Sequence, residues 1–96
     1  MSLELYHRKT CSFSRRVRTF IEDNGLKPRI VYHDIDEDPA ARRKLRELTG
    51  EEQTPCLVVE GEPVLESDDI VAWLKAHLVD APRRPRSEPS DEQPRF

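Results

Sequence analysis

The sequence predicts an α/β domain in which helices pack on a four-stranded mixed sheet, in the order β-α-β-α-β-β-α. Strand-like runs alternate with stretches whose apolar residues recur at helical spacing. Near residue 60, a short Gly-containing reversal joins two strand-like runs, so the last two strands should be antiparallel. Because a helix joins the first two strands, these should be parallel with a right-handed crossover.

The first strand and the first helix flank a turn that contains a cysteine. Residues 2–7 alternate apolar and polar in the manner of a strand. A helix is predicted from Ser12 to about Asn24, with Gly25 as a natural stop. Its apolar residues recur at helical spacing, and they are Phe13, Val17, Phe20 and Ile21. Cys11 therefore lies at the junction between the predicted strand and the predicted helix.

The second strand and the second helix follow Pro28. Residues 29–33 are a nearly continuous apolar, β-branched run, which is typical of a strand buried on both faces of a mainly parallel sheet. Asp38 can cap the next helix, Pro39 suits its first turn and Gly50 ends it. The inner face of this helix is predicted to carry Ala41, Leu45 and Leu48.

A β-hairpin and a last helix complete the domain. Residues 56–59 and 64–65 are strand-like, and Glu60-Gly61-Glu62 between them indicates a tight reversal. Ser67 is predicted to cap the last helix, with acidic residues in its first turn. The buried face of this helix should comprise Ile70, Val71, Leu74 and Leu78, with Trp73 at its margin. Sheet and helices in this order form the thioredoxin-like architecture.

Composition indicates one small folded domain over residues 1–79 and a Pro/Arg/Glu-rich disordered tail over residues 80–96. A net charge of −3 argues against a nucleic-acid binder. No apolar run approaches the roughly 20 residues that span a bilayer, so no membrane partner is expected. The two cysteines form no disulfide framework and the N-terminus has no signal-peptide pattern. We expect a cytoplasmic monomer.

Cys11 is the candidate nucleophile. A thiol reacts as its thiolate, and an ordinary cysteine with a pKa of about 8.5 is only a few per cent ionised at neutral pH. Amides of Phe13 and Ser14 at the helix start can point at the sulfur, and the Ser14 hydroxyl can donate to it. The basic residues expected to favour the thiolate are Arg8, Lys9, Arg15, Arg16 and Arg18. A buried structural cysteine beside a solvated basic helix face is the alternative.

Ser14 limits any redox chemistry to one protein thiol. A cysteine at this position would allow an internal disulfide with Cys11, whereas serine provides no resolving thiol. An external thiol must then attack a mixed disulfide on Cys11 to complete a redox cycle. The spacing therefore predicts a monothiol mechanism for a reactive Cys11.

Two later segments have the chemistry of a ligand site. A cis Thr54–Pro55 bond would turn the Thr54 N–H and C=O towards an extended ligand, and an ordinary trans proline entering a strand is the alternative. In residues 66–69, Ser67 and the following amides suit a carboxylate, while the acidic side chains suit an ammonium group. A ligand with an amino-acid end would satisfy both. The alternative is a well-capped surface helix.

Taken together, these segments resemble the glutaredoxin family, and in particular the glutaredoxin-like N-terminal domain of glutathione S-transferases. The resemblance spans about residues 3–78. Its motifs are Leu-Tyr-x-x-x-x-Cys-x-Phe-x-Arg-Arg-Val (5–17), Thr-Pro-x-Leu-Val (54–58) and Pro-Val-Leu-Glu-Ser-x-x-Ile (63–70). It implies the thioredoxin-like (glutaredoxin) fold, a cis Pro55 and a glutathione-dependent thiol–disulfide oxidoreductase. Such an enzyme would reduce glutathionylated proteins or small mixed disulfides through catalytic Cys11.

The resemblance also implies how glutathione, the co-substrate, is bound. The Thr54 backbone would pair with its cysteinyl part, and residues 66–68 would hold its γ-glutamyl end. Arg8 or Lys9 would meet its glycine carboxylate. The full set of residues expected to bind glutathione is Arg8, Lys9, Phe13, Ser14, Thr54, Pro55, Glu66, Ser67 and Asp68.

Departures from the family keep two other functions open. The absent resolving thiol allows a non-catalytic glutathione- or partner-binding module. An iron–sulfur cluster carrier is less favoured, because Ser12 replaces the glycine of the Cys-Gly-Phe-Ser form. Cys56 is expected to point away from Cys11 and to pack in or beneath the sheet. The histidines lack metal-ligand spacing, so no metal is expected.

Overall fold

The computed structural model describes residues 2–79 and has a four-stranded sheet in the order β2-β1-β3-β4. The strands are β1 (Leu3–His7), β2 (Val31–Asp34), β3 (Cys56–Val59) and β4 (Glu62–Leu65). The helices are α1 (Ser12–Asp23), α2 (Pro39–Thr49) and α3 (Ser67–Leu74), with a 3-10 turn at Lys27–Arg29 and a π-helical turn at Lys75–Val79. β1 is parallel to β2, and β3 is antiparallel to both β1 and β4. This confirms the predicted thioredoxin-like architecture; the predicted tail, residues 80–96, lies outside the described residues.

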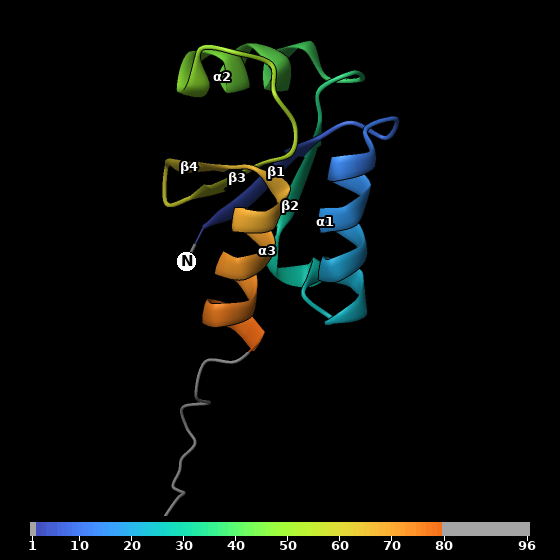
Figure 1. The fold of residues 1–96 in the computed structure, drawn as a ribbon. Coiled ribbons are helices and arrows are strands. Elements are labelled where there is room, and N and C mark those ends of the chain that lie inside the picture. The colour runs from blue at the N-terminus through green and yellow to red at the C-terminus, as the bar shows by residue number, and fades with distance from the viewer. Residues whose placement is uncertain (1, 80–96) are drawn as a thin grey trace, which may run out of the picture.

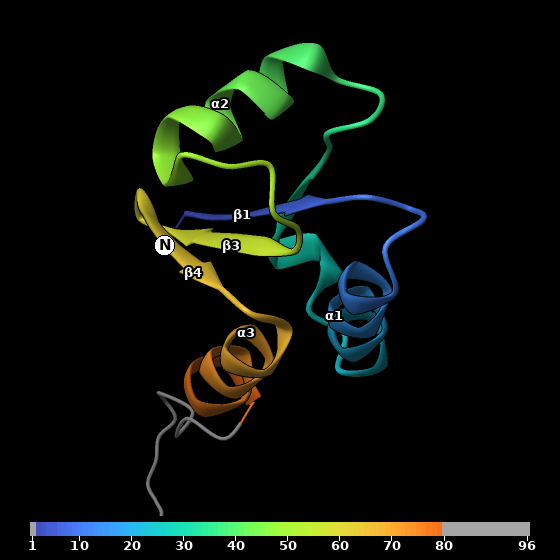
Figure 2. The same ribbon diagram turned by 45° about the horizontal axis from the view of Figure 1, so that its top comes forward.

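The sheet lies between helix α2 on one side and helices α1 and α3 on the other (Figure 1). Apolar side chains form one cluster on each face of the sheet. Helices α1 and α3 lie side by side on one face, and α2 covers the other (Figure 2). Alternate residues of each strand point to opposite faces, so Leu57 of β3 packs with α1 and α3 while Cys56 packs towards α2. In the cluster between the sheet and helices α1 and α3, the largest fully buried side chains are Leu5, Ile21, Leu57, Ile70 and Leu74.

Helix α2 begins and ends as predicted. The Asp38 carboxylate accepts hydrogen bonds from the amides of Ala40 (3.0 Å) and Ala41 (3.2 Å), which satisfies two of the otherwise unpaired donors of the first turn. Gly50 adopts a left-handed conformation with φ 82° and ends the helix. Leu45 is fully buried on the inner face.

The prediction that the second strand is buried on both faces is wrong. β2 lies at the edge of the sheet, pairs with β1 alone, and leaves Val31 57% exposed. Residues 27–29 form a 3-10 turn, so the strand also begins later than predicted. Buried Ile30 packs into the core from the turn itself. A continuous apolar run does not distinguish an edge position from a central one, because that depends on where the crossover places the strand.

The hairpin between β3 and β4 is confirmed. Glu60 and Gly61 have φ of 51° and 87°, the positive values that a tight two-residue turn requires at both positions. The hairpin places β4 at the second edge of the sheet, immediately before α3. None of the helices within residues 2–79 has the length and apolar character needed to cross a membrane.

Candidate functional site

Cys11 lies at the junction of β1 and α1, as predicted. A turn closed by a hydrogen bond from the Cys11 amide to the Arg8 carbonyl oxygen (3.2 Å) follows β1. Cys11 is the N-cap residue of α1, and its carbonyl oxygen accepts from the Arg15 amide at 3.0 Å. Its side chain is partly exposed and is not in a disulfide. The thiol therefore lies at the helix end that favours negative charge.

Hydrogen bonds around the sulfur favour its thiolate. Partial burial is the largest single influence, and it raises the pKa of Cys11. The hydroxyl and amide of Ser14 oppose it, followed by Thr54 and the Phe13 amide, and together these hydrogen bonds bring the pKa below its ordinary value of 9.0. While protonated, the Cys11 thiol donates to the Thr54 carbonyl oxygen, 3.7 Å from Sγ. The predicted contribution of Ser14 and Phe13 is confirmed.

The basic residues near Cys11 are not among the main influences on its pKa, which differs from the emphasis of the prediction. The main influences that lower the pKa of the thiol are hydrogen bonds from Ser14, Thr54 and Phe13. The cations directly ahead of it are instead compensated by carboxylates from distant segments. Their ion pairs are Arg8–Asp36 (3.0 Å), Arg8–Glu52 (3.4 Å) and Lys9–Glu37 (3.1 Å). A cation already paired with a carboxylate adds little to the potential at a neighbouring sulfur, so Arg8 and Lys9 should favour the thiolate less than their positions in the sequence suggest.

Two residues of α1 hold the loop in front of Cys11. Arg18 donates from Nη1 to the Arg8 carbonyl oxygen and lies 3.0 Å from Nδ1 of His7. Fully buried Ser14 accepts from the Arg8 amide through Oγ at 3.4 Å. Burial, and after it the Arg18 charge, lower the pKa of His7, so the neutral ring accepts from Arg18 at neutral pH. Both backbone groups of Arg8 are thus held from α1.

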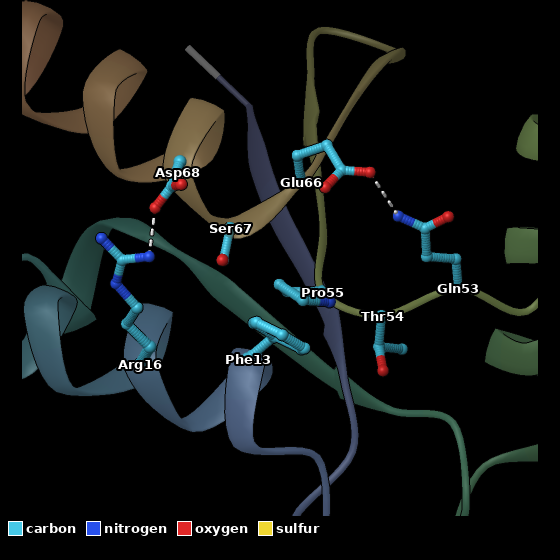
Figure 3. A pocket seen from close by; sticks show the side chains of 8 residues that line it. All are labelled: Phe13, Arg16, Gln53, Thr54, Pro55, Glu66, Ser67 and Asp68. Carbon is cyan, nitrogen blue, oxygen red and sulfur yellow. Dashed lines mark hydrogen bonds and ion pairs between the residues drawn. The ribbon is translucent and has the colours of Figure 1, made fainter.

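A groove of about 310 Å³ opens beside Thr54 (Figure 3). Its lining residues are Phe13, Arg16, Gln53, Thr54, Pro55, Glu66, Ser67 and Asp68. Phe13 is 62% exposed and forms one wall. The Thr54–Pro55 bond is cis, as the resemblance implied. Because the Thr54 carbonyl oxygen also contacts Cys11, one end of the groove lies next to the thiol.

The structure brings together six of the nine residues predicted to bind glutathione and adds two others. Ser14 lies beneath the thiol rather than in the groove, and Arg8 and Lys9 lie outside the lining set. Sequence reasoning missed Arg16 and Gln53. Arg16 follows Phe13 by three residues, which places both on one helix face, and Gln53 directly precedes Thr54. These spacings were the available signals.

Two side-chain pairs join residues that line the groove (Figure 3). Arg16 of α1 donates from Nη1 to Oδ1 of Asp68 on α3. Gln53 donates from Nε2 to Oε2 of Glu66 at 3.2 Å. Two of the three acidic side chains of residues 66–69, Glu66 and Asp68, are therefore engaged by groove residues.

The prediction that Ser67 caps α3 is wrong. Glu66 is the N-cap residue, with φ 73°, and no side chain caps the first amides. Ser67 is the first helical residue and is 8% exposed, between the walls of the groove. β4 ends at Leu65, so one residue alone makes the turn into α3 and the cap shifts back by one position. The first amides of α3 therefore lack the side-chain cap that the alternative of a well-capped surface helix assumed.

Cys56 is a packing residue, as predicted. It is fully buried on the α2 side of the sheet, in a cluster that includes Tyr6, Ile35 and Leu45. Burial raises its pKa to about 11. Within residues 2–79, no group of three or more His, Cys, Asp or Glu side chains is arranged to hold a metal ion.

Comparison with solved structures shows what the fold is similar to. The thioredoxin-like protein BC3987 is 28% identical over 68% of this chain and 86% of its own length, with a TM-score of 0.59. A glutathione transferase family member from Pseudomonas fluorescens Pf-5, solved with bound glutathione, is 23% identical over 92% of this chain, with a TM-score of 0.69. Glutathione transferase Omega 3C from Trametes versicolor is 17% identical over 78% of this chain, with a TM-score of 0.65. The chain spans 44% and 33% of these two transferases.

The sequence comparison gives the family. No curated protein matches the chain. The profile of the glutaredoxin family, described as Glutaredoxin, matches residues 3–64. This range includes Cys11, the loop in front of it and the cis Pro55, which form one end of the groove. The chain belongs to the glutaredoxin family.

Proposed function

We propose that the protein is a glutathione-dependent thiol–disulfide oxidoreductase of the monothiol type, with Cys11 as its catalytic residue. One observation carries the proposal: a thiol whose pKa is lowered by hydrogen bonds contacts Thr54, which lines a groove with both cationic and anionic walls. The substrate would be a mixed disulfide between glutathione and a protein or small thiol. We also propose that it works as a monomer in the cytoplasm, where reduced glutathione is available.

The proposed cycle uses one protein thiol twice. The Cys11 thiolate attacks the glutathione sulfur of the mixed disulfide, so a new S–S bond forms and the substrate thiolate leaves with the electron pair of the broken bond. The departing thiolate takes up a proton. The thiolate of a second glutathione then attacks the glutathione sulfur on Cys11, which releases glutathione disulfide and restores the Cys11 thiolate. Ser14 cannot intercept the intermediate, and buried Cys56 is inaccessible to it.

The groove residues have distinct roles in this proposal. The Thr54 backbone would pair with the cysteinyl part of glutathione, while Phe13 and Pro55 pack against it. Glu66, Ser67 and Asp68 would hold the γ-glutamyl end. Arg8 and Lys9 are weaker candidates for the glycine carboxylate, because carboxylates of this chain already pair with both.

A coupled assay with glutathione, glutathione reductase and NADPH tests the proposal. With a glutathionylated peptide as substrate, Cys11→Ser should reduce turnover at least about 1000-fold, because no other group can form the mixed disulfide. Cys56→Ala is the matched control and should stay within about threefold of the unmodified chain. Turnover that survives Cys11→Ser would exclude Cys11 as the catalytic residue.

A glutathione-binding module without turnover is the second candidate. Ser14 in place of a resolving thiol, together with Glu66 and Ser67 in the groove, supports it, because these features are compatible with binding without a redox cycle. Glutathione binding seen by titration calorimetry, together with an unmodified chain that does not turn over in the coupled assay, would establish this candidate instead.

A further inference from the structure

The Arg16–Asp68 ion pair places opposite charges on facing walls of the groove. Arg16 comes from α1 and Asp68 from α3, and both side chains line the hollow between the helices. Their side chains are 54% and 77% exposed. Ion pairs at such exposure contribute little to stability, so a ligand can replace either partner at small cost.

Ser67 and the start of α3 add a second positive element. The first amides of α3 have no side-chain cap, and Ser67 lies within the groove beside Asp68 (Figure 3). Arg16 and these amides attract a carboxylate, whereas Asp68 attracts an ammonium group. The two charges of an α-amino acid are separated by a single carbon atom. The groove therefore presents a charge pattern that complements a zwitterion.

We infer that Arg16 is a specificity-determining residue for the α-amino-acid end of a γ-glutamyl ligand. The ligand ammonium takes the place of the Arg16 guanidinium at Asp68, and the ligand α-carboxylate binds to the released guanidinium and to Ser67. Each charge of the internal pair is thus matched by a charge of the ligand. The inference rests on the proposed function, to which it adds a role for a residue outside the predicted set.

The neighbouring Arg15 provides a matched control. It is also an exposed arginine on α1, one residue away, but it does not line the groove. Removing either arginine changes the net charge of the chain equally. A general electrostatic effect on an anionic ligand would therefore appear in both variants, whereas a direct contact would appear in Arg16→Ala alone.

The test varies the ligand and the protein together. One fluorescent cysteine peptide is joined by a disulfide bond to each of three thiols. The first is glutathione, the second is γ-aminobutyryl-cysteinyl-glycine, which lacks the α-carboxylate, and the third is glutaryl-cysteinyl-glycine, which lacks the ammonium group. Peptide release by the full chain gives the second-order rate constant for Cys11 attack on each disulfide. Iodoacetamide alkylation of Cys11 in each variant measures any change in the thiol itself.

For the glutathione disulfide we expect Arg16→Ala to lower the rate constant about tenfold, as loss of a hydrogen-bonded charge contact does. With the carboxylate-free analogue, Arg16→Ala and the unmodified chain should agree within about twofold. Arg15→Ala should stay within about twofold for all three ligands. Asp68→Asn should slow the two ligands that carry an ammonium group and leave the glutaryl analogue unchanged.

An equal loss with all three ligands in Arg16→Ala, or a loss of the same size in Arg15→Ala, would overturn the inference. So would an unchanged rate with the glutathione disulfide. These results leave disulfide exchange at Cys11 intact, and the proposed function with it. If the unmodified chain attacks none of the three disulfides faster than a free cysteine peptide does, the proposed function fails, and the inference that rests on it fails as well.

Discussion

Cys11 and Cys56 lie close to the same cis proline and have opposite properties. Cys11 contacts the Thr54 carbonyl oxygen, and Cys56 directly follows Pro55. Cys11 is partly exposed with a lowered pKa, while Cys56 is fully buried with a pKa raised to about 11. The two thiols belong to different layers of the molecule, because Cys11 begins a helix and Cys56 faces α2 through the sheet.

The comparison shows which physical factor selects a reactive thiol. Burial raises the pKa of both cysteines, so desolvation alone does not distinguish them. The difference lies in hydrogen-bond donors: Ser14 supplies two to Cys11, whereas one backbone hydrogen bond at Val64 opposes the larger burial of Cys56. The start of helix α1 therefore stabilises the thiolate of Cys11, whereas burial in the sheet interior keeps Cys56 protonated.

The largest expected effect is the difference in alkylation rate between the two thiols. At about pH 7, a thiol of pKa about 11 is ionised to about 0.01%, against at least about 1% for a thiol at or below 9.0. We expect iodoacetamide to modify Cys11 at least about 100-fold faster than Cys56 in the folded chain, with burial widening the gap. Peptide mapping by mass spectrometry measures both rates. In denaturant the rates should converge, and a similar rate for both in the folded chain would contradict the assignment.

The second prediction concerns stability at alkaline pH. Because the pKa of Cys56 is higher in the folded state than its ordinary 9.0, the unfolded chain releases its proton first. Stability from this residue is therefore constant below about pH 9 and falls by about 1.4 kcal/mol per pH unit between about pH 9 and 11. Cys56→Ala should remove this loss, so urea unfolding of the two chains should show a free-energy difference that changes by about 1.4 kcal/mol between about pH 8 and 10.

Tyr6 and Tyr32 also have raised pKa values, and their contribution is common to both chains. Only the difference between the unmodified chain and Cys56→Ala isolates the thiol. A difference that stays constant over this pH range would show that Cys56 ionises in the folded chain as readily as in the unfolded one.

The third prediction removes the principal hydrogen-bond donor of Cys11. Ser14→Ala should raise the thiol pKa and shift the alkylation profile to higher pH, because the thiolate loses a hydroxyl donor while burial is unchanged. Near neutral pH we expect the alkylation rate to fall about fivefold, which corresponds to about 1 kcal/mol for one partly exposed hydrogen bond to a charge. Ser12→Ala is the control, since Ser12 is exposed and is not among the main influences on the thiol pKa. Equal effects of the two variants would show that the Ser14 hydroxyl does not specifically stabilise the Cys11 thiolate.

Local sequence signals predicted those interactions of the site and the fold in which both partners lie in one short segment. Cys11, Phe13 and Ser14 lie within one helical turn, and the cap at Asp38 lies within three residues of the amides that it accepts from. The edge position of β2 depends on the crossover, and the Arg16–Asp68 pair joins residues 52 positions apart. Neither follows from local spacing. The resemblance to glutaredoxins supplied the cis bond, which residue preferences alone leave open.

The same limit applies to the cations near Cys11, for which we expect the smallest effect. Sequence proximity suggested that Arg8 stabilises the thiolate, but its guanidinium is paired with Asp36 and Glu52, 28 and 44 positions away. Arg8→Gln should therefore change the alkylation rate of Cys11 by less than about twofold, and higher ionic strength should change the rate of the unmodified chain equally little. Iodoacetamide is uncharged, so its encounter with the protein adds no salt dependence. A fall as large as that in Ser14→Ala would mean that the cation acts on the thiolate despite its carboxylate partners, and that hydrogen bonding alone does not separate Cys11 from Cys56.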